Sequence, residues 1–146
     1  MLTACAVIQF ARLSGFSPII TTASKQNEAF LRSIGATHVV DRNAPLSGLG
    51  AAVEAITVKP VKFAYDAVSS AETQNAAYDI LAPGGKLGIV LDKAVDAAKL
   101  AAGKEVGHIW ANVNLPQHRE IGKSLYAKLT GLLEAGEIKV LFLVRL

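Results

Sequence analysis

The chain has 146 residues, of which 51% are hydrophobic and 18% are charged, and its formal net charge at pH 7 is +3. This length suits one α/β core, and the low charge content argues against disorder. No apolar run is long enough to cross a bilayer, and the scattered Lys and Arg argue against nucleic acid as a partner, so we expect a soluble domain without membrane.

The first half of the chain alternates between helical and extended patterns. Ser24 occupies an N-cap position, and Gly35 is expected to end the helix that Ser24 precedes. The expected elements are a helix over 2–13, a strand over 17–23, a helix over 25–34, a strand over 37–40 and a small helix over 51–56. This order predicts a β-α-β unit, from which parallel sheets are built.

The second half repeats the alternation. The expected elements are a strand over 61–68, a helix over 71–81, a strand over 86–91, a helix or loop over 94–103, an extended stretch over 106–113, a helix over 116–134 and an apolar run over 138–146. The turn Pro83-Gly84-Gly85 separates the helix from the following strand. A second β-α-β unit is therefore predicted.

The cysteine and histidine content excludes two kinds of site. Cys5 is the lone cysteine, so an internal disulfide cannot form, and no secretory signal pattern is present; we expect a cytoplasmic protein. His38, His108 and His118 lie far apart in the sequence and lack the spacing of zinc ligands. No metal site is predicted.

The order of elements carries three sequence signatures of a known family. They are SIGATHVVD at 33–41, DAV at 66–68 and PGGKL at 83–87. With them the chain resembles the medium-chain dehydrogenase/reductase superfamily, and within it the fungal enoyl reductase and quinone reductase branch. The likeness covers roughly residues 3–140.

The resemblance implies an α/β fold with an incomplete Rossmann-like, doubly wound parallel sheet. Family members carry a catalytic domain, a first strand and a glycine-rich loop ahead of the helix that begins here at Thr3. In the strand order 3-2-1-4-5-6 the first strand is central, so a chain without it leaves strands two and four without their shared neighbour. We expect residues 1–146 to be a partial cofactor-binding domain, truncated at both ends, with a C-terminal tail leading back toward the catalytic domain.

The resemblance also implies a cofactor. Where many Rossmann folds have an acid that binds the ribose of NAD, this chain has Ser24, Lys25 and Asn27, which suit the 2′-phosphate of NADPH. The alternative is that Ser24 caps the helix and that its two neighbours are solvated residues of the first turn. Arg42 follows the next strand, where its guanidinium could stack on the adenosine or reach the phosphate, or remain solvated.

Two further positions lie at the ends of later strands. Val90 and Leu91 are expected to line the nicotinamide side, because open α/β sheets bind ligands at the carboxyl ends of their strands. Asp66 ends the preceding strand, and we favour a buried structural acid that accepts hydrogen bonds from backbone donors. No catalytic residue is predicted, since the proton donor of such reductases would come from outside these residues.

The sequence therefore predicts the cofactor-binding portion of an NADPH-dependent oxidoreductase of the enoyl or quinone/carbonyl reductase type. As an isolated chain it is expected to be inactive and to bind NADPH at millimolar concentration or not at all, because the glycine-rich loop is lacking. Its partner in a full-length relative would be a small-molecule substrate. The alternatives are a methyltransferase-like domain that binds S-adenosylmethionine, and an interaction module or homo-oligomer that pairs through open sheet edges.

Overall fold

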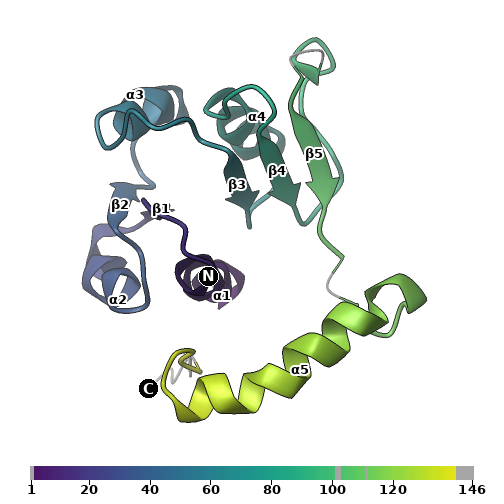
Figure 1. Ribbon diagram of the computed structural model, residues 1–146. Coiled ribbons are helices and arrows are strands. Elements are labelled where there is room, and N and C mark those ends of the chain that lie inside the picture. The colour runs from purple at the N-terminus through teal and green to yellow at the C-terminus, as the bar shows by residue number, and fades with distance from the viewer. Residues whose placement is uncertain (1, 101–102, 111, 141–146) are drawn as a thin grey trace, which may run out of the picture. The chain divides into compact units, whose positions relative to one another are not determined.

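A computed structural model describes residues 2–100, 103–110 and 112–140 of the chain. The chain separates into two compact units, Thr3–Ile109 and the residues from Trp110 onward. All strands of the described residues lie in the first unit (Figure 1). That unit therefore holds the sheet architecture that the sequence predicts.

The first unit contains two separate parallel sheets. β1 (Ile20–Ala23) pairs with β2 (His38–Asp41), and the second sheet has the order β3 (Phe63–Asp66), β4 (Lys86–Ile89), β5 (Glu105–His108). Among the described residues, no strand pairs with β1 on the side away from β2, and none pairs with β3 on the side away from β4. The predicted fold, an incomplete Rossmann-like parallel sheet without its first central strand, is confirmed.

One helix connects β1 to β2, and another connects β3 to β4. α1 (Leu2–Leu13) has the bounds that the sequence predicts, and α4 (Ala71–Asp79) ends two residues earlier than expected. The predicted helix over 25–34 is divided into a 3₁₀ turn, η1 (Lys25–Asn27), and α2 (Glu28–Ser33). Such tightened turns are common at helix N-termini. A short helix, α3 (Leu49–Glu54), follows β2.

The strands are shorter than the apolar runs that predicted them. Ile19 precedes β1, and its N–H binds the Thr37 hydroxyl oxygen at 2.9 Å instead of a neighbouring strand. After β3, the N–H of Val68 binds the Asp66 carboxylate at 2.9 Å and turns the chain away from the sheet. Of the stretch over 94–103 that was expected to be helix or loop, residues 94–99 form loop and turn, and residues 101–102 lie outside the described residues. A strand pairs only as far as it and its neighbouring strand both remain extended. Hydropathy alone does not show where that pairing ends.

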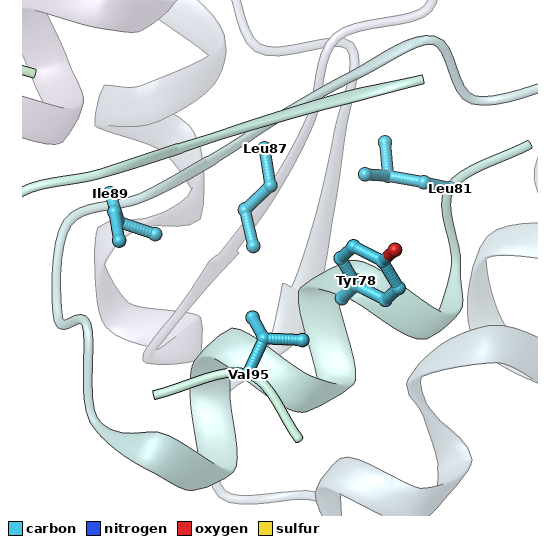
Figure 2. Close-up of a cluster of buried hydrophobic side chains, with 5 residues drawn as sticks. All are labelled: Tyr78, Leu81, Leu87, Ile89 and Val95. Carbon is cyan, nitrogen blue, oxygen red and sulfur yellow. The ribbon is translucent and has the colours of Figure 1, made fainter. Parts of the chain in front are cut away.

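Figure 2 shows a cluster of buried apolar side chains between the second sheet and α4. Leu87 and Ile89 alternate along β4, so both point toward the same side, and each is 1% exposed. They meet Tyr78 of α4, also 1% exposed, together with Leu81 and Val95. Parallel strands require an apolar cover, and α4 provides it here.

Two glycine positions shape the chain around these sheets. Gly35 has φ 124°, and a Cβ built on it would lie 3.0 Å from the Cβ of Arg12 in α1, so the predicted helix stop is confirmed. In the turn before β4, Gly84 has φ 70°, and a Cβ on Gly85 would lie 2.8 Å from the Ala82 carbonyl oxygen. Gly35 therefore supplies a backbone conformation with positive φ next to α1. In the turn before β4, Gly84 supplies positive φ and Gly85 allows the close approach of the Ala82 carbonyl oxygen.

The second unit contains a 3₁₀ turn, η4 (Pro116–His118), and the helix α5 (Arg119–Glu134). The predicted helix over 116–134 is therefore confirmed in extent. Gly122 packs against Val113, where a Cβ would lie 2.9 Å from the valine Cβ. Of the apolar run over 138–146, residues 141–146 lie outside the described residues.

Candidate functional site

The predicted site residues follow the carboxyl ends of parallel strands. Ser24 follows β1, Arg42 follows β2, Asp66 ends β3 and Val90 follows β4. Because the strands of each sheet are parallel, these ends meet at one edge of each sheet. Ligands of open α/β sheets bind at such edges.

The first sheet brings a hydroxyl and two cations together. The backbone N–H of Arg42 donates to the carbonyl oxygen of Ala23 at 3.0 Å, which places Arg42 beside the residue that precedes Ser24. Lys25 begins η1, and both Lys25 and Arg42 are exposed. The carboxylate of Asp41, which ends β2, accepts a hydrogen bond from the N–H of Asn43 at 2.9 Å. The arrangement suits an anionic ligand.

Ser24 takes the N-cap position without using its side chain. Its backbone is extended, with φ −69° and ψ 141°, and its carbonyl oxygen accepts from the N–H of Asn27 at 2.9 Å. The Ser24 hydroxyl makes no capping hydrogen bond. Lys25 forms no ion pair within the part of the chain that the structure describes. Ser24 therefore has the backbone conformation of an N-cap residue but does not cap with its side chain. Its hydroxyl remains available to hydrogen-bond a ligand.

The second sheet places the other predicted pair. The N–H of Val90 donates to the Ser69 hydroxyl oxygen at 2.9 Å, and Val90 is half-buried. Leu91 follows with 56% of its surface exposed. The structure thus brings Ser24, Lys25, Asn27 and Arg42 together on one sheet, and Val90 and Leu91 on the other.

Asp66 is a structural acid, as the sequence favours. It is 7% exposed, and one carboxylate oxygen accepts the N–H groups of Val68 and Ser69, each at 2.9 Å. The other oxygen accepts the Thr73 hydroxyl at 2.7 Å. Ser69 has φ 57°, a conformation that is costly for a serine, and these hydrogen bonds stabilise it. The loop that supports Val90 is fixed in this way.

Gln74 is a supporting residue that sequence reasoning missed. It is 0% exposed, and its amide nitrogen donates to the carbonyl oxygens of Ser69 at 2.9 Å and Asp92 at 2.8 Å. Its amide oxygen accepts the N–H of Ala94 at 2.8 Å. One side chain therefore joins the loops after β3 and β4. A glutamine in the middle of a helix usually faces solvent, so no sequence signal distinguishes this one.

Tyr65 lies beside these loops. A Cβ on Gly88 of β4 would lie 3.3 Å from both the Tyr65 ring and the Ile109 side chain, so the two side chains flank the glycine closely. Burial, and then the charge of the adjacent Asp66, raise the pKa of the Tyr65 phenol above its ordinary value. At neutral pH the phenol stays protonated and can act as a hydrogen-bond donor.

Other kinds of site lack support in the described residues. No group of three or more His, Cys, Asp or Glu within them could hold a metal ion, so they do not fit a zinc site. None of the described helices combines the length and apolar character needed to span a membrane. A cavity of about 550 Å³ between α3 and α4 is lined by Val53, Val61 and Leu81 among others, and includes none of the predicted site residues.

Comparison with known proteins identifies one family. The sequence profile described as "Zinc-binding dehydrogenase" matches residues 4–91. A trans-enoyl reductase of Gibberella fujikuroi is 26% identical over 153 aligned residues, which cover 94% of this chain and 43% of that protein. The chain thus spans less than half of the length of this curated relative.

Solved structures share the fold. A mycobacterial protein whose structure is complexed with NADPH has a TM-score of 0.76 and 20% identity, over 94% of this chain and 43% of its own. A quinone oxidoreductase of Pseudomonas syringae has a TM-score of 0.75 and 20% identity, over 93% of this chain and 43% of its own. The chain therefore shares the fold of part of each of these solved structures.

Proposed function

The chain belongs to the zinc-binding dehydrogenase family, a branch of the medium-chain dehydrogenase/reductase superfamily, and from this premise we propose that residues 1–146 form the NADPH-binding portion of an enoyl or quinone/carbonyl reductase. The observation that carries the choice of NADPH is the cluster of Ser24, Lys25 and Arg42 at the carboxyl end of the first sheet. The mycobacterial structure complexed with NADPH supports the same choice, and the similarity to a fungal trans-enoyl reductase supports the reductase type.

In this proposal the cluster binds the 2′-phosphate of NADPH. Lys25 supplies a point charge, Arg42 supplies planar donors, and the Ser24 hydroxyl donates a hydrogen bond to a phosphate oxygen. Asn27 adds an amide group from η1. NADH lacks this phosphate, so the two cations would have no charged group to bind. The preference for NADPH is therefore an electrostatic one.

Val90 and Leu91 would lie on the nicotinamide side. Both are apolar, and Val90 is held through its backbone by Ser69. Bound NADPH supplies the hydride in this class of reaction, while the protein orients the ring and the acceptor double bond or carbonyl. We assign no proton donor to residues 1–146. The isolated chain is proposed to be inactive, since the substrate would be held by residues outside it.

The phosphate cluster can be tested apart from the rest of the cofactor. We would titrate the chain with adenosine 2′,5′-bisphosphate and with adenosine 5′-monophosphate, and follow amide shifts by NMR. A preference of about tenfold or more for the bisphosphate is expected, because charge-assisted hydrogen bonds to the 2′-phosphate distinguish the two ligands. Equal affinities would remove the basis for choosing NADPH.

Variants assign the preference to residues. Lys25→Ala and Arg42→Ala should each reduce it several-fold, because each removes a charge that faces the phosphate. Lys59→Ala is the matched control, since Lys59 is exposed in the same unit but lies before β3 rather than after a strand. An equal loss in the control would indicate nonspecific attraction to a basic protein.

A further inference from the structure

β3 and β4 stop pairing where side chains take over their backbone donors. The last residue pair of the two strands is Asp66 with Ile89. At the other end of the strands, the N–H of Lys86 donates to the carbonyl oxygen of Lys62 at 2.9 Å. Backbone groups alternate in direction along a strand, so the same spacing further along would join the N–H of Val90 directly to the carbonyl oxygen of Asp66. The structure has a different arrangement at this point.

The hydroxyl of Ser69 lies between these two backbone groups. Its oxygen accepts the N–H of Val90 at 2.9 Å, and the hydroxyl donates to the carbonyl oxygen of Asp66 at 2.8 Å. The next donor on the side of β3, the N–H of Val68, is taken by the Asp66 carboxylate at 2.9 Å. One hydroxyl group therefore replaces a direct hydrogen bond between the strands and holds their carboxyl ends apart.

Ser69 adopts a backbone conformation that is costly for serine. Its φ is 57°, and it is the sole non-glycine residue with positive φ in the part of the chain that the structure describes. Glycine adopts this conformation without steric cost, so the path of the backbone alone would favour glycine here. What serine adds is the hydroxyl group. Backbone outliers that their surroundings hold in place cluster at functional positions.

Further contacts fix Ser69 and the loop that follows β4. Ser69 is 4% exposed, its N–H donates to the Asp66 carboxylate at 2.9 Å, and its carbonyl oxygen accepts from the Gln74 amide nitrogen at 2.9 Å. The same amide nitrogen donates to the carbonyl oxygen of Asp92 at 2.8 Å. The loop from Val90 to Asp92 is therefore held at its start by the Ser69 hydroxyl and at its end by the Gln74 amide.

We propose that the Ser69 hydroxyl is a spacer that keeps Val90 out of the sheet, and that Ser69 is thereby a positioning residue for the nicotinamide ring. The inference rests on the proposed function, in which Val90 and Leu91 lie on the nicotinamide side. Without the spacer, the N–H of Val90 binds the carbonyl oxygen of Asp66 directly, and β3 and β4 pair further. Val90 then moves toward β3, and the dihydronicotinamide loses the fixed place that hydride transfer requires.

The spacer can be tested without a ligand. Ser69→Gly keeps the backbone conformation and removes the hydroxyl. We would measure the NMR coupling across a hydrogen bond between the amide nitrogen of Val90 and the carbonyl carbon of Asp66. No coupling is expected in the wild type, where the hydroxyl intervenes, and a coupling should appear in the variant. A coupling in the wild type, or none in Ser69→Gly, overturns the proposal.

The adjacent serine provides a matched control. The Ser70 hydroxyl oxygen accepts from the N–H of Thr73 at 3.2 Å, at the start of α4, rather than from β4. Ser70→Ala should therefore show no coupling between Val90 and Asp66, although it loses a helix cap. A coupling in Ser70→Ala would mean that any weakening of this loop lets the strands pair further, and would overturn the role of the Ser69 hydroxyl.

Reduced nicotinamide mononucleotide tests the positioning role. We would follow saturation transfer from the protein to the ring protons by NMR, which detects millimolar binding. Ser69→Gly should bind several-fold more weakly than the wild type, and Ser70→Ala should bind equally well. A purely structural role predicts the reverse order, since glycine suits the φ of Ser69 and Ser70→Ala removes a cap. Equal binding by the wild type and Ser69→Gly, or binding by neither, overturns the proposal.

The bisphosphate titration tests the proposed function separately, at the first sheet, where Lys25 and Arg42 follow the strands. Ser69→Gly should leave the preference for adenosine 2′,5′-bisphosphate unchanged. If the wild type shows that preference but binds the mononucleotide no better than Ser69→Gly does, this proposal alone fails. If the wild type lacks that preference, the choice of NADPH fails, whatever the coupling at Val90 shows.

Discussion

The two sheets of the first unit support the segments at the carboxyl ends of their strands in different ways. Beyond β3 and β4, buried Asp66, Ser69 and Gln74 hold the loops through side-chain hydrogen bonds, above a cluster in which Leu87 and Ile89 are 1% exposed. Beyond β1 and β2, the corresponding segment carries exposed Lys25 and Arg42. In the proposed function, the rigid edge would receive the nicotinamide ring and the exposed, charged edge would bind the 2′-phosphate.

The largest effect is expected in the apolar cluster of the second sheet. Leu87→Ala should lower the free energy of unfolding by about 2–5 kcal/mol, because it removes a fully buried side chain and leaves a cavity. Chemical denaturation measures the change. Val39→Ala in half-buried β2 is the matched variant and should cost less. Equal losses would mean that the two sheets are packed equally well.

The next test addresses the loops. Gln74→Leu keeps most of the side-chain volume but leaves the carbonyl oxygens of Ser69 and Asp92 and the N–H of Ala94 without this partner. We expect a loss of roughly 2–4 kcal/mol in the same measurement. Gln26→Leu, an exposed position in η1, should change stability by less than about 0.5 kcal/mol. A small effect at Gln74 would contradict the proposed role of its side chain.

A pair of serines compares the helix starts directly. The Ser70 hydroxyl oxygen accepts from the N–H of Thr73 at 3.2 Å at the start of α4, whereas Ser24 makes no such bond. Ser70→Ala should therefore cost about 1 kcal/mol, and Ser24→Ala close to none. Thermal unfolding of the two variants decides this. A comparable loss at Ser24 would restore its interpretation as a capping residue and weaken its assignment to a ligand.

The smallest effect is expected at alkaline pH. The raised pKa of Tyr65 means that the folded state keeps this proton at a pH where the unfolded chain releases it. The stabilisation is fully present below about pH 10 and declines as pH rises through the folded-state pKa. Tyr65→Phe should flatten the stability profile above pH 10, and Tyr126→Phe, at an exposed position in α5, should not. Parallel profiles for wild type and Tyr65→Phe would refute the shift.

Local patterns predicted much of this architecture. The helix over 2–13, the stop at Gly35 and the long helix from Pro116 depend on neighbours a few residues away, so hydropathy and turn chemistry reveal them. Strand ends were predicted less well, because they depend on where an adjacent strand remains extended. The 3₁₀ turn at Lys25 likewise required the structure.

The residues of the candidate site could be placed from the sequence, but the residues that support them could not. Its residues could be placed from sequence because ligand edges follow strand ends, and strand ends follow the alternation of elements. Whether those residues bind NADPH remains a prediction. The residues that support them could not be found, since Gln74 and Ser69 act through partners about twenty positions away, Asp92 and Val90.

The sequence by itself determined the order of elements, the parallel pairing and the class of sheet. Hydrophobic periodicity, glycine stops and β-α-β order depend on residues that are close in the sequence. Only the tertiary structure decided which polar side chains became buried supports, and where each strand ends. Both outcomes follow from contacts between segments distant in sequence: the buried amide of Gln74 is satisfied by three backbone groups from separate loops, and a strand pairs only as far as its neighbour remains extended.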